Sequence, residues 1–394
     1  VEWGFLDKVI DYASFDAWVT WHLYKELQEQ LTKRSLPPAF GHLMGLDPGS
    51  YSLWDYFLML EMPTLDVFYA MERAGMELDL PYLVSLQGPM MERMEGIKRQ
   101  FARLSGKGDF NPASTPQLQW LFFDKLGAEP LKHTGGGESG NRKPSTDVET
   151  LKQFAVRDDA IGHAAKLGLE YRGYHKLKGT YIDGLLKRVS PDGRIRTSLN
   201  SHVARTGRGS SSDPNLQNIP ARTEDGRMIR RAFIAAPGKI LGCCDQEQLE
   251  PRITAGLSQE PNMCDAIING LDFHSNTAAL MFGIPYDEIV AGKKAENQAM
   301  IDKRFKAKTI GLGLLYGEGL YKLAKQLKCD RDDAKDLSIR YWEAYPNVKR
   351  FQEECVQFAY DHEYITTLLG RRRNLKAINA DDHRFRSEAE RQAG

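Results

Sequence analysis

One segment of this chain repeats residues with polyphosphate-binding chemistry at four-residue intervals. Within residues 303–317 these are Arg304, Lys308, Leu312 and Tyr316. Side chains four residues apart share one face of a helix, so the spacing predicts a helix that carries them in one stripe. Two cations and a tyrosine in such a stripe can bind a triphosphate and stack on a base. A solvated cationic face is the alternative that these four residues leave open.

A second segment places acidic residues after a short apolar run. Residues 240–244 read Ile-Leu-Gly-Cys-Cys and predict a short buried strand, which Asp245, Glu247 and Glu250 follow. A carboxylate at a strand end, facing a cationic helix, is the arrangement of a metal-dependent phosphoryl transferase. The two segments together favour a binding site over a solvated surface.

The composition is that of an ordinary soluble globular protein. The chain has 394 residues, of which 41% are hydrophobic and 27% charged, and its formal net charge is zero. This length leaves room for about two or three domains. Zero net charge argues against a protein that coats nucleic acid without specificity. It still allows a basic cleft that acidic surface offsets elsewhere.

The sequence shows no pattern that would direct the protein to a membrane or out of the cell. The sequence contains neither an apolar stretch of about 18 residues nor a secretory pattern, which predicts a cytoplasmic protein with no membrane partner.

We expect reduced, small core residues at all five cysteines, which are Cys243, Cys244, Cys264, Cys329 and Cys355. The sequence begins at Val1, and residues 12–31 already predict an amphipathic helix. We therefore expect the chain to be part of a longer one.

The pattern along the chain changes near its middle. Residues 1–60 are rich in aromatic side chains and predict helices. A long amphipathic helix is expected from Pro89, with an apolar side formed by Met90, Met94, Ile97, Phe101 and Leu104. The glycine-rich residues 133–145 predict a mobile tip, and residues 145–147 predict the cap of the next helix. From Tyr171 onward, cations and short strands become frequent, so we place the functional half there.

Longer motifs follow one another over nearly the whole chain. Residues 206–220 read Thr-Gly-Arg-Gly-Ser-Ser-Ser-Asp-Pro-Asn-Leu-Gln-Asn-Ile-Pro, and residues 245–252 read Asp-Gln-Glu-Gln-Leu-Glu-Pro-Arg. Residues 271–278 read Leu-Asp-Phe-His-Ser-Asn-Thr-Ala, and the stripe of residues 304–317 comes next. In this order the motifs resemble those of the family A DNA polymerases, which are bacterial repair-type and phage replicative enzymes. The resemblance implies template-directed attack of a primer 3′-hydroxyl on a deoxynucleoside triphosphate, and we expect a phage origin.

The resemblance also implies a fold. It predicts an α+β protein with right-hand polymerase architecture, mostly helical, with a small antiparallel palm sheet. The implied parts are a remnant of a 3′-5′ exonuclease-like proofreading domain (1–60), a thumb (61–165), a first part of the palm (166–265), fingers (266–345) and a truncated second part of the palm (346–394). Tyr12 and Asp16 match the last motif of the proofreading domain.

The resemblance assigns the first palm motif to metal and sugar. It implies that Asp245, with Gln246 beside it, binds two catalytic Mg²⁺ ions, which activate the primer hydroxyl and neutralise the leaving pyrophosphate. Glu250 would lie under the incoming sugar and leave no room for a 2′-hydroxyl. Gln248 is assigned to the nucleotide as well.

The fingers motif is assigned to the rest of the nucleotide. Arg304 and Lys308 would bind the triphosphate, with Lys308 as proton donor to the departing pyrophosphate. Leu312 would flank the sugar and base, and Tyr316 would lie near Glu250. His274 matches a histidine that contacts the triphosphate, although a lone histidine would more often be a core residue.

A third set is assigned to the primer-template duplex. Minor-groove acceptors are nearly the same at every base pair, so an arginine and amides there can check pair shape without reading sequence. In the motif of residues 206–220 the resemblance implies such contacts for Arg208, Asn215, Gln217 and Asn218. It also implies contacts with the duplex phosphates for Arg172 and Lys178, and with the template for Arg391.

Several positions depart from the family pattern. Gln246 stands where the family usually has tyrosine, and Pro251 stands where it has leucine. In the fingers motif, Phe305 stands in place of a second arginine, Gly311 in place of asparagine, and Leu312 in place of phenylalanine or tyrosine. Loss of the ring at Leu312 should change sugar handling and speed. A glycine within a helix costs about 1 kcal/mol relative to alanine, so we expect a packing or conformational reason for Gly311.

The last palm motif of the family, a His-Asp-Glu turn with the second metal-binding aspartate, does not occur in the sequence. We therefore expect an internal polymerase fragment, inactive or weak in isolation, which a separate C-terminal palm polypeptide could complete. One alternative is a single-subunit RNA polymerase, which Glu250 opposes because that enzyme must admit a 2′-hydroxyl. The other is a noncatalytic module that binds primer-template DNA.

Overall fold

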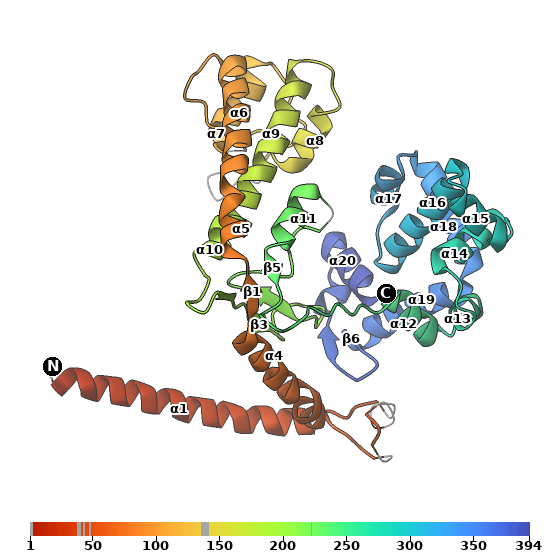
Figure 1. Ribbon diagram of the computed structural model, residues 1–394. Helices are drawn as coiled ribbons and strands as arrows, with labels where there is room; N and C mark the ends of the chain where they lie inside the picture. The colour runs from red at the N-terminus through yellow and green to blue at the C-terminus, as the bar shows by residue number, and fades with distance from the viewer. Residues whose placement is uncertain (1–2, 38–40, 42–43, 47–48, 135–141, 222) are drawn as a thin grey trace. The chain divides into compact units, whose positions relative to one another are not determined.

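The computed structural model describes residues 3–37, 41, 44–46, 49–134, 142–221 and 223–394. The chain forms two compact units, Leu60–Gly242 on the one hand and Val1–Met59 together with Cys243–Gly394 on the other (Figure 1). Both are mostly helical, with small antiparallel sheets. The predicted mostly helical α+β class is therefore confirmed.

The unit of residues 60–242 combines helices with short strands. Its helices are α4 (Met62–Ala74), α5 (Leu80–Ser85), α6 (Gln87–Ser105), α7 (Thr115–Gln119), α8 (Val148–Phe154), α9 (Ala160–Lys176), α10 (Gly184–Leu186) and α11 (Glu224–Arg230), with π-helical η2 (Trp120–Lys125) and η3 (Leu177–Asp183). Strands β1 (Met76–Leu78), β2 (Arg194–Ile195) and β5 (Phe233–Ile234) form an antiparallel sheet in the order β2-β1-β5. Strands β3 (Ser198–Asn200) and β4 (Ser210–Ser212) form a second sheet.

Helix α6 confirms the amphipathic pattern predicted from Pro89. It buries Met90, Ile97 and Phe101 and runs beside α9, which packs against it (Figure 1). It ends where Gly106 adopts a left-handed φ of 70°. The predicted cap of α8 is also confirmed, because the Asp147 side chain accepts a hydrogen bond from the Thr150 amide.

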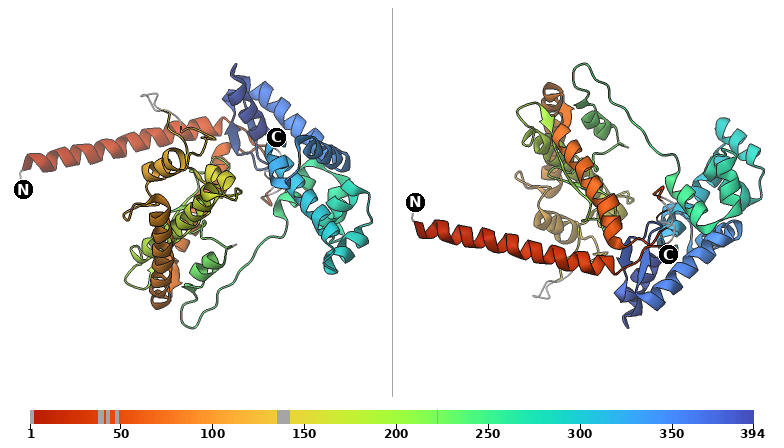
Figure 2. Two further views of the ribbon diagram at one scale, coloured as in Figure 1. Left: turned by 90° about the horizontal axis from the view of Figure 1, so that it is seen from above. Right: turned by 90° about the horizontal axis from the view of Figure 1, so that it is seen from below.

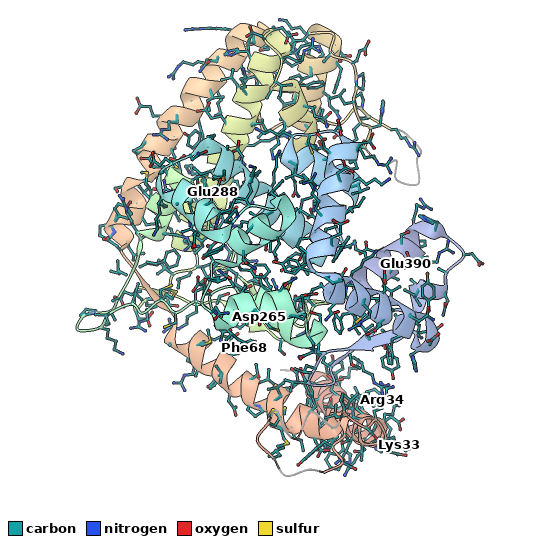
Figure 3. The ribbon with its side chains drawn as sticks, turned by 90° about the vertical axis from the view of Figure 1, so that its right-hand side faces the viewer. Lys33, Arg34, Phe68, Asp265, Glu288 and Glu390 are labelled. Carbon is teal, nitrogen blue, oxygen red and sulfur yellow. The ribbon has the colours of Figure 1, made fainter. Side chains whose placement is uncertain are left out.

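The other unit is built around a cluster of helices in its second segment (Figure 2). Its helices are α1 (Trp3–Thr32), α3 (Leu53–Tyr56), α12 (Leu249–Ser258), α13 (Pro261–Ile268), α14 (Phe273–Phe282), α15 (Tyr286–Lys294), α16 (Gln298–Leu315), α17 (Leu320–Leu327), α18 (Arg331–Ala344), α19 (Pro346–His362), the 3₁₀ turn η4 (Lys376–Asn379) and α20 (His383–Ala393). Strands β6 (Tyr364–Thr366) and β7 (Arg372–Asn374) form a hairpin, and π-helical η1 (Phe57–Glu61) contains the boundary between the units. In Figure 3, Asp265, Glu288 and Glu390 mark α13, α15 and α20.

Close packing around α16 explains its glycines. A Cβ atom on Gly311 would lie 3.0 Å from Cε2 of Tyr341, which is fully buried in α18. A Cβ atom on Gly313 would lie 2.4 Å from Cδ2 of Leu323 in α17. The packing reason expected for Gly311 is therefore present, and the C-terminal half of α16 is held against its neighbours.

The predicted buried strand over residues 240–244 is wrong. The segment has no strand geometry, and Ile240 is 91% exposed. A strand is stabilised by hydrogen bonds to neighbouring strands, and none of the described strands pairs with this segment.

The expectation for the cysteines is only partly met. All five are free, as predicted, but Cys243 and Cys244 lie on the exposed segment and are not core residues. The run that carries them pairs with none of the strands in the described part of the chain, and both cysteines are exposed. Cys264 and Cys329 are half-buried and pack against the helical core.

The glycine-rich tip and the lack of a membrane-spanning segment were the remaining expectations from the sequence. Most of the glycine-rich tip, residues 135–141, lies outside the described residues, so its predicted mobility stays a prediction. None of the described helices is both long and apolar enough to cross a membrane.

Candidate functional site

The stripe predicted on residues 303–317 lies on helix α16. The helix begins after Asn297, whose side chain accepts a hydrogen bond from the Ala299 amide, and it is followed by Tyr316. Along the stripe Arg304 and Leu312 are half-buried, whereas Lys308 and Tyr316 are exposed. The predicted helix is confirmed, and the four residues of its stripe are all at least partly exposed.

Arg304 pairs with an aspartate from another helix. Its Nε lies 3.0 Å from Oδ1 of Asp272, and its Nη2 lies 2.9 Å from Oδ2. Nε also lies 3.2 Å from Oγ of Ser275. Burial by itself would raise the pKa of Asp272, but hydrogen bonds from Arg304 and Ser275 outweigh burial and hold that pKa well below its usual range. Asp272 is therefore ionised at neutral pH.

Asp272 and Ser275 were missed as site residues, although both belong to the motif at residues 271–278. The signal that could have identified Asp272 is its place as the cap of a helix, two residues before His274.

His274 is the second residue of α14 and is half-buried. Burial, followed by the positive charges of Arg304 and Lys308, lowers the pKa of His274 to about 4. The imidazole is therefore neutral at pH 7, where it can donate or accept a hydrogen bond without adding charge. Its neighbour Ser275 contacts Arg304, and α14 packs against α16, so His274 lies near the stripe.

This pKa predicts a pH dependence of stability. The unfolded chain binds the His274 proton at a pKa of about 6.5, whereas the folded chain binds it at about 4, so stability falls as the pH drops through this window. Glutamine does not take up this proton, so His274→Gln should lose less stability than the wild type as the pH falls. The expected difference in the free energy of unfolding is about 1–2 kcal/mol, which allows for the partial solvent exposure of His274. Urea unfolding of both proteins between pH 4.5 and 7 measures the difference. Parallel stability curves for the two proteins would contradict a neutral, half-buried imidazole at position 274.

Tyr316 and Glu250 form the second contact of the site. The Tyr316 hydroxyl donates to Oε1 of Glu250 over 2.6 Å, which confirms the predicted proximity. Glu250 is the second residue of α12, and Gln248 caps this helix in a left-handed conformation with φ of 55°. A tyrosine at the end of α16 and a carboxylate at the start of α12 thus meet at the C-terminal end of the stripe.

Asp245 and Gln246 lie on the exposed segment before α12. Among the described residues, no group of three or more histidine, cysteine, aspartate or glutamate side chains could hold a metal ion. A pair of catalytic ions needs bridging carboxylates, and Mg²⁺ keeps one or two carboxylates beside water and substrate phosphates. The described residues therefore do not fit a two-ion site by themselves.

The motif of residues 206–220, which is predicted to contact the duplex, lies in the unit of residues 60–242 and is held by hydrogen bonds within that unit. The side chain of Asn215 accepts a hydrogen bond from the Asn218 amide over 3.2 Å, and Gln217 donates to the Gly209 carbonyl over 3.2 Å. The Tyr181 hydroxyl donates to the Asn218 carbonyl. Arg208 and the three amide side chains are exposed.

The other three cations assigned to DNA have contacts within the chain. Half-buried Arg172 donates to the Thr146 carbonyl, and burial lowers its pKa. Lys178 pairs with Asp183 at 2.6 Å, and Nε of Arg391 lies 3.0 Å from Oε2 of Glu388. Their predicted contacts with DNA stay predictions.

Comparisons with known proteins agree on one family. The sequence profile of DNA polymerase family A matches residues 81–394. DNA polymerase I of Pseudomonas aeruginosa is 37% identical over 383 residues, covering 97% of this chain and 38% of that protein. DNA polymerase I of Chloroflexus aurantiacus is 36% identical over 389 residues, covering 98% of this chain and 38% of that protein. The chain thus spans less than half the length of these relatives.

A solved structure is similar in fold. The polymerase domain of Pol1 from M. smegmatis, in complex with a DNA primer-template and a dNTP, has a TM-score of 0.73 and 34% sequence identity. The similarity covers 86% of this chain and 57% of that chain.

Proposed function

The chain belongs to DNA polymerase family A, and we propose that its residues serve template-directed DNA synthesis. In this reaction a primer 3′-hydroxyl attacks a deoxynucleoside triphosphate and releases pyrophosphate. The observation that carries the proposal is the face of α16, where two cations lead along one stripe to the Tyr316–Glu250 contact. The dNTP and primer-template in the similar Pol1 structure support the same substrates.

The phosphates are assigned to three side chains. Arg304 and Lys308 bind the triphosphate as cations, and neutral His274 adds a hydrogen bond. Lys308 is exposed, so it can reach the leaving pyrophosphate and give it a proton.

The sugar and base are assigned to the end of the stripe. Glu250 fills the space of a 2′-hydroxyl, and its hydrogen bond to Tyr316 holds the carboxylate in place. Leu312, one turn before Tyr316, flanks the sugar and base without an aromatic ring. Gln248, the residue that caps α12, is assigned to the nucleotide as well.

The metal site remains one part of the proposal. Asp245 and Gln246 would supply part of a Mg²⁺ site, and two ions there would serve as Lewis acids at the reacting phosphate. A second carboxylate would come from further polypeptide, either a longer form of the chain or a separate C-terminal palm polypeptide.

The wider assignments follow the same family. We propose the thumb at 61–165, the palm at 166–265 and 346–394, the fingers at 266–345, and a proofreading-domain remnant at 1–60. A phage origin and a cytoplasmic site of action are part of this proposal. The assignment of Glu250 to the 2′ face of the sugar disfavours a single-subunit RNA polymerase, because that enzyme must admit a 2′-hydroxyl.

A noncatalytic role in binding primer-template DNA is the second candidate. It is favoured by one observation, the lack of a metal-binding group of side chains among the described residues. Both proposed functions require binding of primer-template DNA. They differ in catalysis, so a measurement of primer extension distinguishes them.

DNA binding should be electrostatic and independent of sequence. We expect the affinity of the chain for primer-template duplex to fall steeply with salt, because lysine and arginine contacts to phosphates release counterions. Arg208→Ala should weaken binding to all sequences alike. Fluorescence anisotropy with duplexes of different sequence, at several salt concentrations, measures both effects.

Arg157→Ala is the matched control. Arg157 is an exposed arginine of the same unit, paired with Asp159 at 2.6 Å outside the motif of residues 206–220. Binding that does not depend on salt, or equal losses in the two variants, would contradict the assignment of Arg208.

A further inference from the structure

We propose that Asp272 is a positioning residue, which fixes the guanidinium group of Arg304 in the orientation that binds a polyphosphate. The proposal rests on the proposed function of α16 as the triphosphate-binding helix. Asp272 would not touch the substrate and would act only through Arg304.

The geometry of the ion pair leaves Arg304 able to bind. Asp272 contacts Nε and Nη2, which form the side-on edge of the guanidinium group. This side-on pair uses Nε–H and one N–H of Nη2, so the carboxylate does not use the end-on edge, which is formed by Nη1 and the second N–H of Nη2. A guanidinium group can bind two anions at different edges, and its end-on fork suits the paired oxygens of a phosphate. Carboxylate and phosphate therefore need not compete.

Asp272 is itself held from several directions. Its Oδ1 accepts a hydrogen bond from the Ser275 amide over 2.8 Å, so the carboxylate caps α14. Its backbone amide donates to the Tyr286 hydroxyl over 2.9 Å, and Tyr286 is the first residue of α15. Helices α14 and α15 both pack against α16, which carries Arg304. The carboxylate is thus a fixed reference point for the arginine.

A fixed arginine binds better than a mobile one. A free arginine side chain has many rotamers and loses their entropy when it binds, whereas an arginine already held by Asp272 has lost it on folding. The pair is shielded, with side-chain exposures of 22% for Arg304 and 30% for Asp272, so its interaction is screened less than that of a surface pair. The expected consequence is tighter binding of the triphosphate.

The test compares triphosphate binding by designed variants of the 394-residue chain. Asp272→Asn keeps a good helix cap but loses the charge and one oxygen acceptor of the side-on pair. Calorimetric titration with dATP and Mg²⁺ should show binding weakened by about tenfold or more, as expected for loss of a hydrogen-bonded charge. Asp330→Asn is the control, because Asp330 caps α18 in the same way, through the Asp333 amide, and should leave dATP binding unchanged.

A double-mutant cycle separates positioning from a structural role. If Asp272 acts through Arg304, Asp272→Asn should weaken binding much less in an Arg304→Lys background than in the wild type. The NMR signal of Arg304 Nε–H should be protected from exchange in the wild type and in Asp330→Asn, and lose that protection in Asp272→Asn. This signal does not depend on nucleotide.

The outcomes distinguish this proposal from the proposed function. Absence of dATP binding by the wild type would overturn the nucleotide site itself and, with it, the role of Asp272. If the wild type binds but Asp272→Asn binds equally well, or weakens binding by the same factor in both backgrounds, the site stands and the positioning role is wrong.

Discussion

The isolated chain of 394 residues is expected to extend a DNA primer at least about a thousandfold more slowly than an intact family member. Two-metal catalysis needs bridging carboxylates, and the described residues contain no group of side chains that could hold a metal ion. A loss of this size is typical when a principal electrostatic stabiliser of a transition state is removed. Single-turnover extension of a labelled primer, with dNTP and Mg²⁺ in excess, measures the rate.

Contaminating polymerase is the main hazard in this measurement. Asp245→Asn, purified in the same way, is the matched control, because residual activity that survives this substitution does not come from the proposed site. The prediction would be wrong if a pure wild-type preparation extended the primer rapidly and Asp245→Asn abolished that activity. That result would show that the chain assembles a competent metal site without further polypeptide.

Glu250→Ala is expected to relax discrimination between sugars, in a form of the protein that catalyses extension. Glu250 is held by the Tyr316 hydroxyl at 2.6 Å and should occlude the 2′ face of the incoming sugar. A steric clash of about 3 kcal/mol corresponds to a discrimination factor of roughly 150. Some loss of overall rate is expected too, because the substitution removes the hydrogen bond that Tyr316 donates to Glu250. The measured quantity is therefore the ratio of kcat/KM for deoxynucleotide and ribonucleotide.

Two further variants test the origin of this effect. Glu247→Ala removes a carboxylate three residues earlier, on the exposed segment before α12, and should leave the ratio unchanged. Tyr316→Phe keeps the ring but removes the hydroxyl that holds Glu250, so it should relax selectivity less than Glu250→Ala. If the ratio for Glu250→Ala stays constant while both rates fall, Glu250 has a structural role and the sugar-gate assignment is wrong.

Local patterns predicted the elements that depend on local physics. The four-residue spacing of the stripe predicted α16, and the spacing of apolar residues predicted α6, because helical hydrogen bonds join residues four apart in one segment. Asp147 was recognised as a cap for the same reason, since its partner, the Thr150 amide, lies three residues away. The motifs of residues 245–252 and 304–317 also predicted the contact between Glu250 and Tyr316, but only by resemblance to a family.

Residues 240–244 show where a local pattern fails. A short apolar run with two cysteines is compatible with a strand, yet a strand is stable only beside a partner strand, and none of the described strands provides one. The π-helical segments such as η2 and η3 were not predicted either. No simple periodicity in the sequence marks a helix that widens by one residue.

The sequence by itself determined the family, the helical stripe and the identity of the side chains available for chemistry, because these depend on residue order and on contacts within one turn. Tertiary structure alone decided how those side chains are arranged. Asp272 meets Arg304 although 32 residues separate them, and Gly311 is needed because Tyr341 from α18 packs against it. The lowered pKa of His274 likewise arises from burial and from two cations on another helix. Such contacts exist only after separate helices have packed, since no local spacing encodes the distance between them.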